Sequence, residues 1–142
     1  MNELCAGLLV YRYIDDRLQF LLSHPANNKN QIYAIAKGHL ETGETKLKAA
    51  IRETLEETGV RAKPIVELPS IHYELKRSKS TKTVTFFLAE YISGVDEDGN
   101  AIAHDKENDV VKFFDADNLP SIFNTQKPVI ESAIKYLERK QT

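Results

Sequence analysis

Hydrophobic residues along the chain gather in short runs separated by polar, turn-forming segments. Runs of strand length, rich in β-branched and aromatic residues, predict strands over residues 4–13, 18–23, 32–36, 81–92 and 109–115. Imperfect alternation predicts one or two further strands within residues 62–75. Segments rich in Asp, Asn, Gly or Pro predict turns or loops at residues 15–17, 24–30, 38–44 and 94–100.

Two segments have helical periodicity, at residues 45–58 and 127–140. Thr45 or Glu44 suits the N-cap of the first helix, Gly59 suits its C-terminal stop, and Pro128 suits the first turn of the second. The first helix is expected to bury one stripe of residues, which comprises Leu47, Ala50, Ile51, Thr54 and Leu55.

Strands mixed with two helices in this order predict an α/β fold, with helices on both faces of a mixed β-sheet. The 142 residues are expected to form a single domain over residues 1–142. With 42% hydrophobic residues and a net charge of -2, the chain does not have the composition of a disordered protein.

Composition also limits the compartment and the partners. No apolar run approaches the length of a membrane span, and the N-terminal segment lacks the basic start of a signal peptide. The lone Cys5 excludes a disulfide framework and a multi-cysteine metal site, and it fits a reducing, cytoplasmic location. The slightly acidic balance argues against a stable nucleic-acid partner. The oligomeric state stays open.

Charge is distributed unevenly. Residues 76–82 carry Lys76, Arg77, Lys79 and Lys82 with no acid, whereas residues 96–109 carry six acids and one lysine. Such runs are usually solvated surface and by themselves decide nothing.

Three glutamates, Glu53, Glu56 and Glu57, share one face of the first predicted helix, because residues three and four apart are surface neighbours. Arg52 can pair with Glu56, but one arginine does not neutralise three acids. A solvated acidic face is one interpretation of this cluster. The other is a site for a hard cation such as Mg²⁺, which prefers oxygen ligands.

The segment GHLETGETKLKAAIRETLEETGV, which starts at Gly38, resembles the Nudix box. The box consists of Gly, five residues, Glu, seven residues, and then Arg-Glu-aliphatic-any-Glu-Glu-any-Gly-aliphatic. The matching positions are Gly38, Glu44, Arg52, Glu53, Glu56, Glu57, Gly59 and Val60. Thr54 departs from the pattern, since an aliphatic residue is usual there, and Ala36 replaces a common proline before the box.

The resemblance implies a Nudix-type α/β/α sandwich and hydrolysis of a nucleoside diphosphate linked to another group. It implies Mg²⁺, with Mn²⁺ as an alternative, and it implies a metal site and catalytic roles for the box residues. The implied metal ligands are Glu53, Glu56 and Glu57, completed by Glu44 and the backbone carbonyl of Gly38. Arg52 would orient the carboxylates.

Nudix branches often place a general base in a loop before the last strand of the sheet, and Glu107 occupies that place. An additional metal ligand and a solvated acidic residue are the other interpretations of Glu107. The remaining histidines, His24, His72 and His104, are expected to be incidental, and Cys5 is expected to be a core residue.

The segments KTVTFFLAEY and VVKFFD resemble the diadenosine tetraphosphate hydrolase branch of the family. For such a substrate, Lys37, His39 and Lys82 are candidate phosphate partners, and Tyr73 is a candidate for stacking on adenine. Structural or solvated roles remain open for each of them.

The leading hypothesis is therefore hydrolysis of a dinucleoside polyphosphate, with a small-molecule nucleotide as the only expected partner. A close alternative is removal of oxidised dNTPs. Cleavage of an RNA 5′ end or of a diphosphoinositol phosphate fits less well. A non-catalytic Nudix domain that senses a ligand is the alternative from a different class.

Overall fold

The computed structural model describes residues 2–76 and 78–141, so Arg77 of the basic segment lies outside the described residues. The described chain forms a seven-stranded mixed sheet with the order β4-β6-β1-β2-β7, in which β3 pairs with β1 and β5 pairs with β6. The strands are β1 (Asn2–Ile14), β2 (Arg17–Pro25), β3 (Gly38–His39), β4 (Arg61–Glu67), β5 (Ile71–Leu75), β6 (Ser80–Ser93) and β7 (Asn108–Asp115). The helices are α1 (Lys46–Thr58), the 3₁₀ turn η1 (Asn124–Gln126) and α2 (Lys127–Lys140).

The centre of the sheet is the parallel pair β1 and β6, whose register runs from Asn2 beside Thr81 to Tyr11 beside Glu90. The other pairings are antiparallel. The hairpin between β1 and β2 turns at Asp15 and Asp16, which have positive φ angles of 50° and 64°, as the sequence predicts for a turn.

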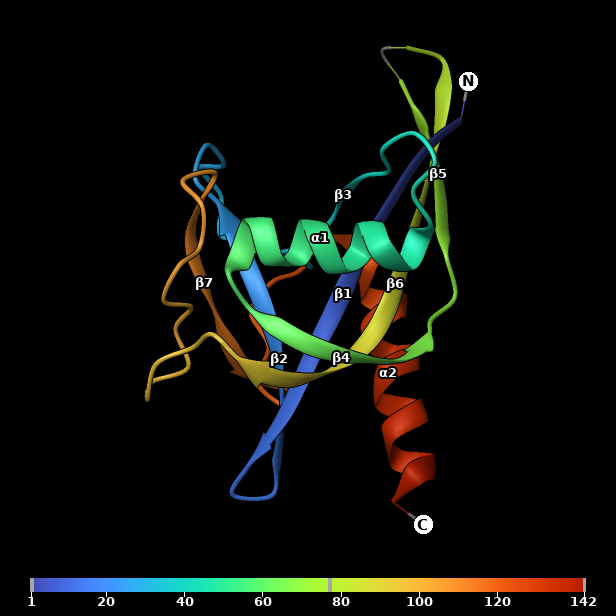
Figure 1. The fold of residues 1–142 in the computed structure, drawn as a ribbon. Helices are drawn as coiled ribbons and strands as arrows, with labels where there is room; N and C mark the ends of the chain where they lie inside the picture. The colour runs from blue at the N-terminus through green and yellow to red at the C-terminus, as the bar shows by residue number, and fades with distance from the viewer. Residues whose placement is uncertain (1, 77, 142) are drawn as a thin grey trace.

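The two helices lie on opposite faces of the sheet (Figure 1). Because side chains alternate along a strand, Leu9 and Tyr11 of β1 join the core that α2 covers, whereas Leu8 and Val10 join the core that α1 covers. The expected α/β/α sandwich with a mixed sheet is confirmed. Cys5 is buried in the first of these cores, as expected.

Local signals place α1 where the sequence predicts it. Thr45 caps the helix by accepting a hydrogen bond from the Lys48 amide, and Gly59 ends it in the left-handed conformation with φ 72°. The predicted buried stripe is partly wrong, because Leu47 and Ile51 are about 40% exposed. The helix instead packs the small residues Ala49, Ala50, Thr54 and Thr58 against the sheet.

The segment before the helix also differs from the prediction. Residues 32–36 form only isolated bridges, in which Ala34 pairs with Ser23 and Tyr33 with Ile122. Gly38 and His39, expected in a loop, form the short strand β3 beside β1. This route carries residues 34–38 across the end of the sheet, where the side chains of the candidate site gather.

Candidate active site

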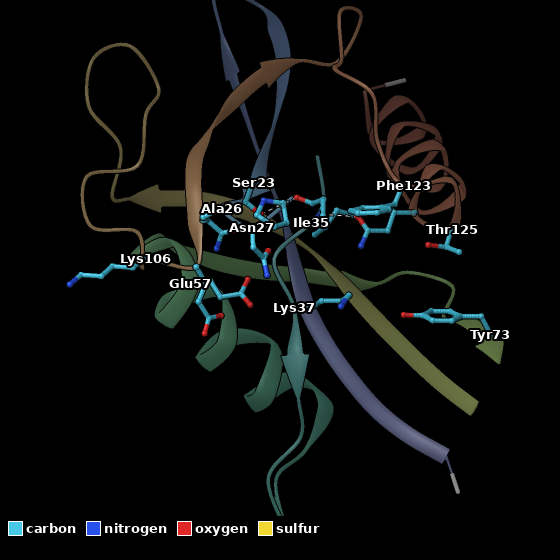
Figure 2. A pocket seen from close by; sticks show the side chains of 15 residues that line it. Ser23, Ala26, Asn27, Ile35, Lys37, Glu57, Tyr73, Lys106, Phe123 and Thr125 are labelled. Carbon is cyan, nitrogen blue, oxygen red and sulfur yellow. Dashed lines mark hydrogen bonds between the residues drawn. The ribbon is translucent and has the colours of Figure 1, made fainter. Parts of the chain in front are cut away.

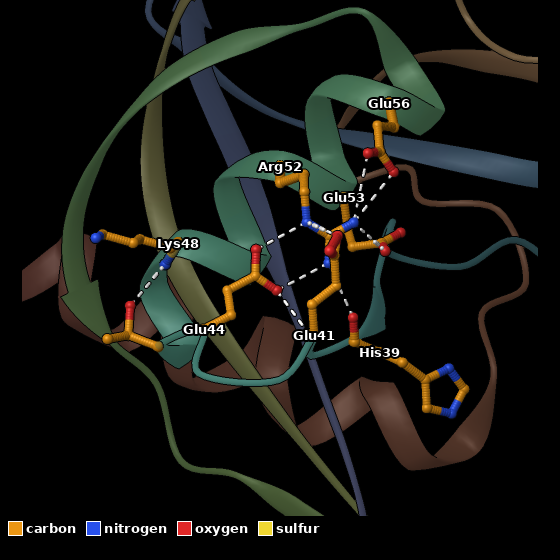
Figure 3. Close-up of polar contacts among 8 residues, drawn as sticks. His39, Glu41, Glu44, Lys48, Arg52, Glu53 and Glu56 are labelled. Atoms are coloured by element: carbon orange, nitrogen blue, oxygen red, sulfur yellow. Dashed lines mark hydrogen bonds and ion pairs between the residues drawn. The ribbon is translucent and has the colours of Figure 1, made fainter.

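Arg52 lies at the centre of the box, surrounded by carboxylates (Figure 3). Its Nε and Nη2 donate to the two oxygens of Glu44 at 2.8 and 2.9 Å, and its Nη1 lies 2.8 Å from Glu53 Oε1. Nη1 also donates to Glu56 Oε2 at 3.2 Å, and Nη2 donates to the His39 carbonyl at 3.0 Å. One planar guanidinium therefore positions three of the box glutamates.

Glu44 is fixed by a second donor, because the backbone amide of Glu41 donates to its Oε1 at 2.9 Å. The hydrogen bonds from Arg52, followed by that from Glu41, lower the pKa of the Glu44 carboxyl to about 2. Glu44 is thus ionised across the neutral range, and it holds Arg52 in place on the side opposite Glu56.

Gly38 makes room for Glu53. A Cβ atom at residue 38 would lie 2.0 Å from the Glu53 carboxyl carbon, so any side chain there would displace that carboxylate. The Gly at the start of the box therefore brings the backbone of β3 against the acidic face of α1.

Thr54, the departure from the usual box pattern, faces the sheet and is fully buried. Its Oγ1 accepts a hydrogen bond of 3.1 Å from the Leu8 amide. On this side of β1, Cys5 and Ala6 pair with β3, and the residues from Tyr11 onward pair with β2. Among the described residues, no strand pairs with Leu8 on that side. The hydroxyl supplies the acceptor that an aliphatic residue would not provide.

A cavity of about 860 Å³ opens beside this cluster (Figure 2). Four of the predicted site residues line it, namely Lys37, Glu57, Tyr73 and Glu107. Figure 2 shows Glu57 and Lys106 at one end, Tyr73, Phe123 and Thr125 at the other, and Lys37 between them. The cavity thus has an acidic end, a central cation and an aromatic end.

Lys37 is half-buried, and burial followed by the charge of Lys82 lowers the pKa of its ammonium group. The proximity of Lys82 follows from the sheet, where it pairs in register with Tyr73 on β5. Lys82 itself lies outside the cavity lining, but its charge acts on Lys37, which does line the cavity. Two neighbouring cations of this kind suit a polyanion such as a phosphate chain.

Glu57 is the box glutamate that enters the cavity. Burial, followed by the charges of Glu53 and Asp105, raises the pKa of its carboxyl to about 8. Asp105 is held there by two contacts: its amide donates to the Glu57 carbonyl at 2.9 Å, and its carboxylate accepts from the Asn108 side chain at 3.0 Å. This end of the site therefore crowds carboxyl groups that Arg52 does not contact, and a bound cation would favour the ionised form of Glu57.

The donors at this end fit a hard divalent cation, because they are carboxylates in excess of the local positive charge. In the described part of the chain, no three His, Cys, Asp or Glu side chains are grouped as ligands ready to hold a metal ion. Three of the box carboxylates instead contact Arg52. Glu53 contacts the guanidinium through Oε1, so its Oε2 would be left for a metal ion without loss of that contact.

The remaining predicted residues lie outside the cavity lining. Gly38, Glu44, Arg52, Glu53 and Glu56 form the neighbouring cluster around the guanidinium. The ring of His39 turns away and lies 2.8 Å from Glu3, while only its backbone carbonyl contacts the cluster.

Sequence reasoning missed several cavity residues, among them Asn27, Phe123 and Gln126. They come from the loop after β2 and from the segment before α2, which carry no recognisable motif. The one feature of the sequence that pointed to any of these three residues was the aromatic Phe123 within a polar segment.

His24 was expected to be incidental, and that expectation is wrong. The residue is buried, with Nδ1 2.8 Å from the Asp109 carboxylate and Nε2 2.5 Å from the Asn30 carbonyl. Those two contacts, the carbonyl first, raise the pKa of the imidazole. His24 thereby ties the Asn-rich loop at the mouth of the cavity to β7. His72 on β5 contacts the Thr83 hydroxyl on β6, and His104 contacts the Asp105 carbonyl.

Comparison with known proteins agrees with this architecture. Residues 5–134 match the model of the NUDIX domain. The chain is 35% identical over 92 residues to the asymmetrical bis(5′-nucleosyl)-tetraphosphatase of Rattus norvegicus, which is 59% of this chain and 62% of the rat protein. It is 33% identical over 100 residues to the putative mutator protein MutT4 of Mycobacterium tuberculosis, covering 66% of this chain and 40% of that protein.

The fold is similar to that in the crystal structure of a C. elegans Ap4A hydrolase binary complex. The two share a TM-score of 0.77 at 21% identity, over 96% of this chain and 98% of that chain. The chain therefore belongs to the Nudix family, as the resemblance of its box implies. The match covers less than two thirds of the length of the rat and mycobacterial relatives. No helix in the described residues is long and apolar enough to cross a membrane.

Proposed function

We propose that this protein is a Mg²⁺-dependent pyrophosphohydrolase that cleaves a dinucleoside polyphosphate such as diadenosine tetraphosphate. The observation that carries the proposal is the cavity of about 860 Å³, which joins an acidic end, a central lysine and an aromatic end. The acidic end suits a metal ion and the phosphate that reacts, the central lysine suits the phosphate chain, and the aromatic end suits a base. Similarity to the rat tetraphosphatase supports the same substrate class.

The metal would be held by Glu53, Glu56 and Glu57, with Glu44 and the Gly38 carbonyl completing the site, and Mn²⁺ is the alternative ion. When bound, the cation would neutralise charge on the phosphate oxygens and lower the pKa of an attacking water. Arg52 holds the carboxylates in position before substrate arrives. Glu107 lines the same cavity as Glu57, and we assign it the role of accepting the proton of the attacking water.

Lys37 and Lys82 are assigned to the phosphate chain, and Tyr73 to stacking on a base. His39 is the weakest of the predicted substrate contacts, because its ring is paired with Glu3. We retain the single-domain organisation and the cytoplasmic location as predictions.

A screen with Mg²⁺ over dinucleoside polyphosphates, dNTPs including 8-oxo-dGTP, nucleotide sugars and NADH tests the proposal. Preference for a dinucleoside polyphosphate is expected. Products formed in ¹⁸O-labelled water identify the phosphorus atom that is attacked. The variant Glu56→Gln should lose turnover with an unchanged far-UV circular dichroism spectrum, since the amide removes one metal-binding charge.

Oxidised-dNTP removal is the second candidate, and the 33% identity to the putative mutator protein MutT4 favours it. A higher kcat/KM for 8-oxo-dGTP than for diadenosine tetraphosphate would establish it instead. A protein that binds nucleotides and hydrolyses none of them would be a sensing domain.

A further inference from the structure

Gln126 is a polar residue that is almost entirely buried, at 3% exposure, and yet lines the cavity. It is the last residue of η1 and precedes the first turn of α2. Its own backbone amide donates to the Phe123 carbonyl at 2.9 Å, so the turn places Gln126 and Phe123 together at the aromatic end.

The orientation of the Gln126 side chain is fixed by one hydrogen bond. Oε1 accepts from the Ile35 amide at 2.8 Å, which is a contact between segments 91 residues apart. A backbone N–H only donates, so the atom facing it must be the carbonyl oxygen of the side chain. The Nε2 group therefore points away from Ile35.

The Nε2 atom has no hydrogen-bond partner among the described residues. Within the same set, every fully buried side-chain nitrogen or oxygen does have a partner, so Nε2 keeps some exposure. Since Gln126 lines the cavity, that exposure is to the cavity. An amide of fixed orientation thus presents donors, and no acceptor, to whatever enters.

The surroundings indicate which part of a ligand meets this donor. Tyr73 and Phe123 lie at the same end of the cavity, apart from Glu57 at the acidic end (Figure 2). Aromatic side chains bind bases through their faces, which leaves the edges of the base free for hydrogen bonds. Base edges carry acceptors, such as the ring nitrogens of adenine or O6 and N7 of guanine.

We propose that Gln126 is a specificity-determining residue, which donates a hydrogen bond from Nε2 to an acceptor atom on the base of the bound nucleotide. The inference rests on the proposed function, because it assumes that a nucleotide occupies the cavity. It deepens that function by assigning the base of the nucleotide to the aromatic end of the cavity.

The test compares AMP with ribose 5-phosphate, which is AMP without its base. Neither contains a pyrophosphate linkage, so binding can be measured by calorimetry or NMR titration without turnover. Gln126→Glu keeps an oxygen for the Ile35 amide and presents an acceptor where Nε2 was a donor. The added charge repels the phosphate of both ligands alike, so we expect AMP binding at pH 8 to weaken about 10-fold more than ribose 5-phosphate binding.

Gln31→Glu is the matched control, because it makes the same change in charge at an exposed position outside the cavity lining. It should leave the affinity for AMP unchanged. Equal losses for AMP and ribose 5-phosphate in Gln126→Glu would show a structural role and would overturn the inference.

A second measurement needs only the unmodified protein. Among the 1-deaza, 3-deaza and 7-deaza analogues of AMP, one should bind about 10-fold more weakly than AMP, because it lacks the acceptor that Nε2 contacts. Equal binding of all four nucleotides overturns the inference.

These outcomes separate the inference from the function on which it rests. A protein that hydrolyses dinucleoside polyphosphates and does not bind AMP keeps the proposed function and loses the role of Gln126. A protein that neither hydrolyses nor binds nucleotides loses both.

Discussion

The carboxyl carbon of Glu53 lies where a side chain at residue 38 would begin, since a Cβ atom on Gly38 would be 2.0 Å away from it. Glu53 also contacts Arg52, which positions Glu44 and Glu56. Because Gly38 has no side chain, the Glu53 carboxylate can occupy this position beside Arg52.

Gly38→Ala should lower activity more than stability. The added methyl group would push Glu53 out of its place, whereas the two-residue strand around it contributes few backbone hydrogen bonds. We expect kcat/KM to fall at least about 10-fold, in line with the effect of misplaced ligands, and the Mg²⁺ concentration for half-maximal activity to rise. If Gly38 acts through Glu53, the substitution should add little to Glu53→Gln. Additive effects would contradict this.

Arg52→Lys should separate charge from geometry. Lysine keeps the positive charge but lacks the planar group that contacts Glu44, Glu53 and Glu56 together. A loss of about 10- to 100-fold in kcat/KM is expected. Arg61→Lys, at an exposed position on β4, is the control and should retain activity. Full activity of Arg52→Lys would show that charge alone suffices.

Thr54→Val should destabilise the protein without any contact with substrate. Valine fills similar space but leaves the Leu8 amide buried without an acceptor, at a cost of about 1–3 kcal/mol in the free energy of unfolding. Urea denaturation measures this change. Thr54→Ser keeps the hydroxyl and should lose less, so a serine variant as unstable as the valine variant would indicate packing instead.

Lys82→Ala should raise KM for diadenosine tetraphosphate by about 10-fold or more, and for a dNTP by less, because the longer phosphate chain loses a charged contact. Lys76→Ala removes the same charge from an exposed position of the basic segment and should change neither value. Equal effects of Lys82→Ala on both substrates would count against its assignment to the phosphate chain.

His24 should make stability depend on pH. Its contacts with the Asn30 carbonyl and Asp109 raise the pKa of the imidazole above the value of about 6.5 expected in the unfolded chain. A raised histidine pKa stabilises the fold fully below about pH 6.5, and that contribution is lost as the pH rises through the folded value. Urea midpoints between pH 5 and 9 should therefore fall more steeply for the unmodified protein than for His24→Gln. Parallel curves would refute this role.

Much of the fold was predictable from local signals. Thr45 and Gly59 identified both ends of α1, and β-branched residues identified β6, because caps and strand propensity act over a few residues. The buried stripe of α1 was less predictable. Hydrophobicity favoured Leu47 and Ile51, but the helix packs through Ala49 and Ala50 instead. Which face meets the sheet depends on tertiary packing.

The candidate site, like the fold, was predictable from the sequence only in part. The spacing of the box predicted which carboxylates share a helix face, and Arg52 was expected to pair with Glu56. The resemblance to the Nudix box also implied that Arg52 orients the carboxylates, and the structure adds that two of its nitrogens contact the two oxygens of Glu44. Gln126 was missed because its position depends on a hydrogen bond to Ile35, far away in the sequence.

The parallel pairing of β1 with β6 has a consequence for synthesis of the protein. β1 (Asn2–Ile14) receives its longest partner only when β6 (Ser80–Ser93) has been made. At ordinary translation rates that delay is roughly 4–16 s. During this delay the apolar strand β1 has left the ribosome, and β2 pairs with only a few of its residues. Nascent chains that stop before residue 80 should therefore be the ones that chaperones bind and proteases degrade.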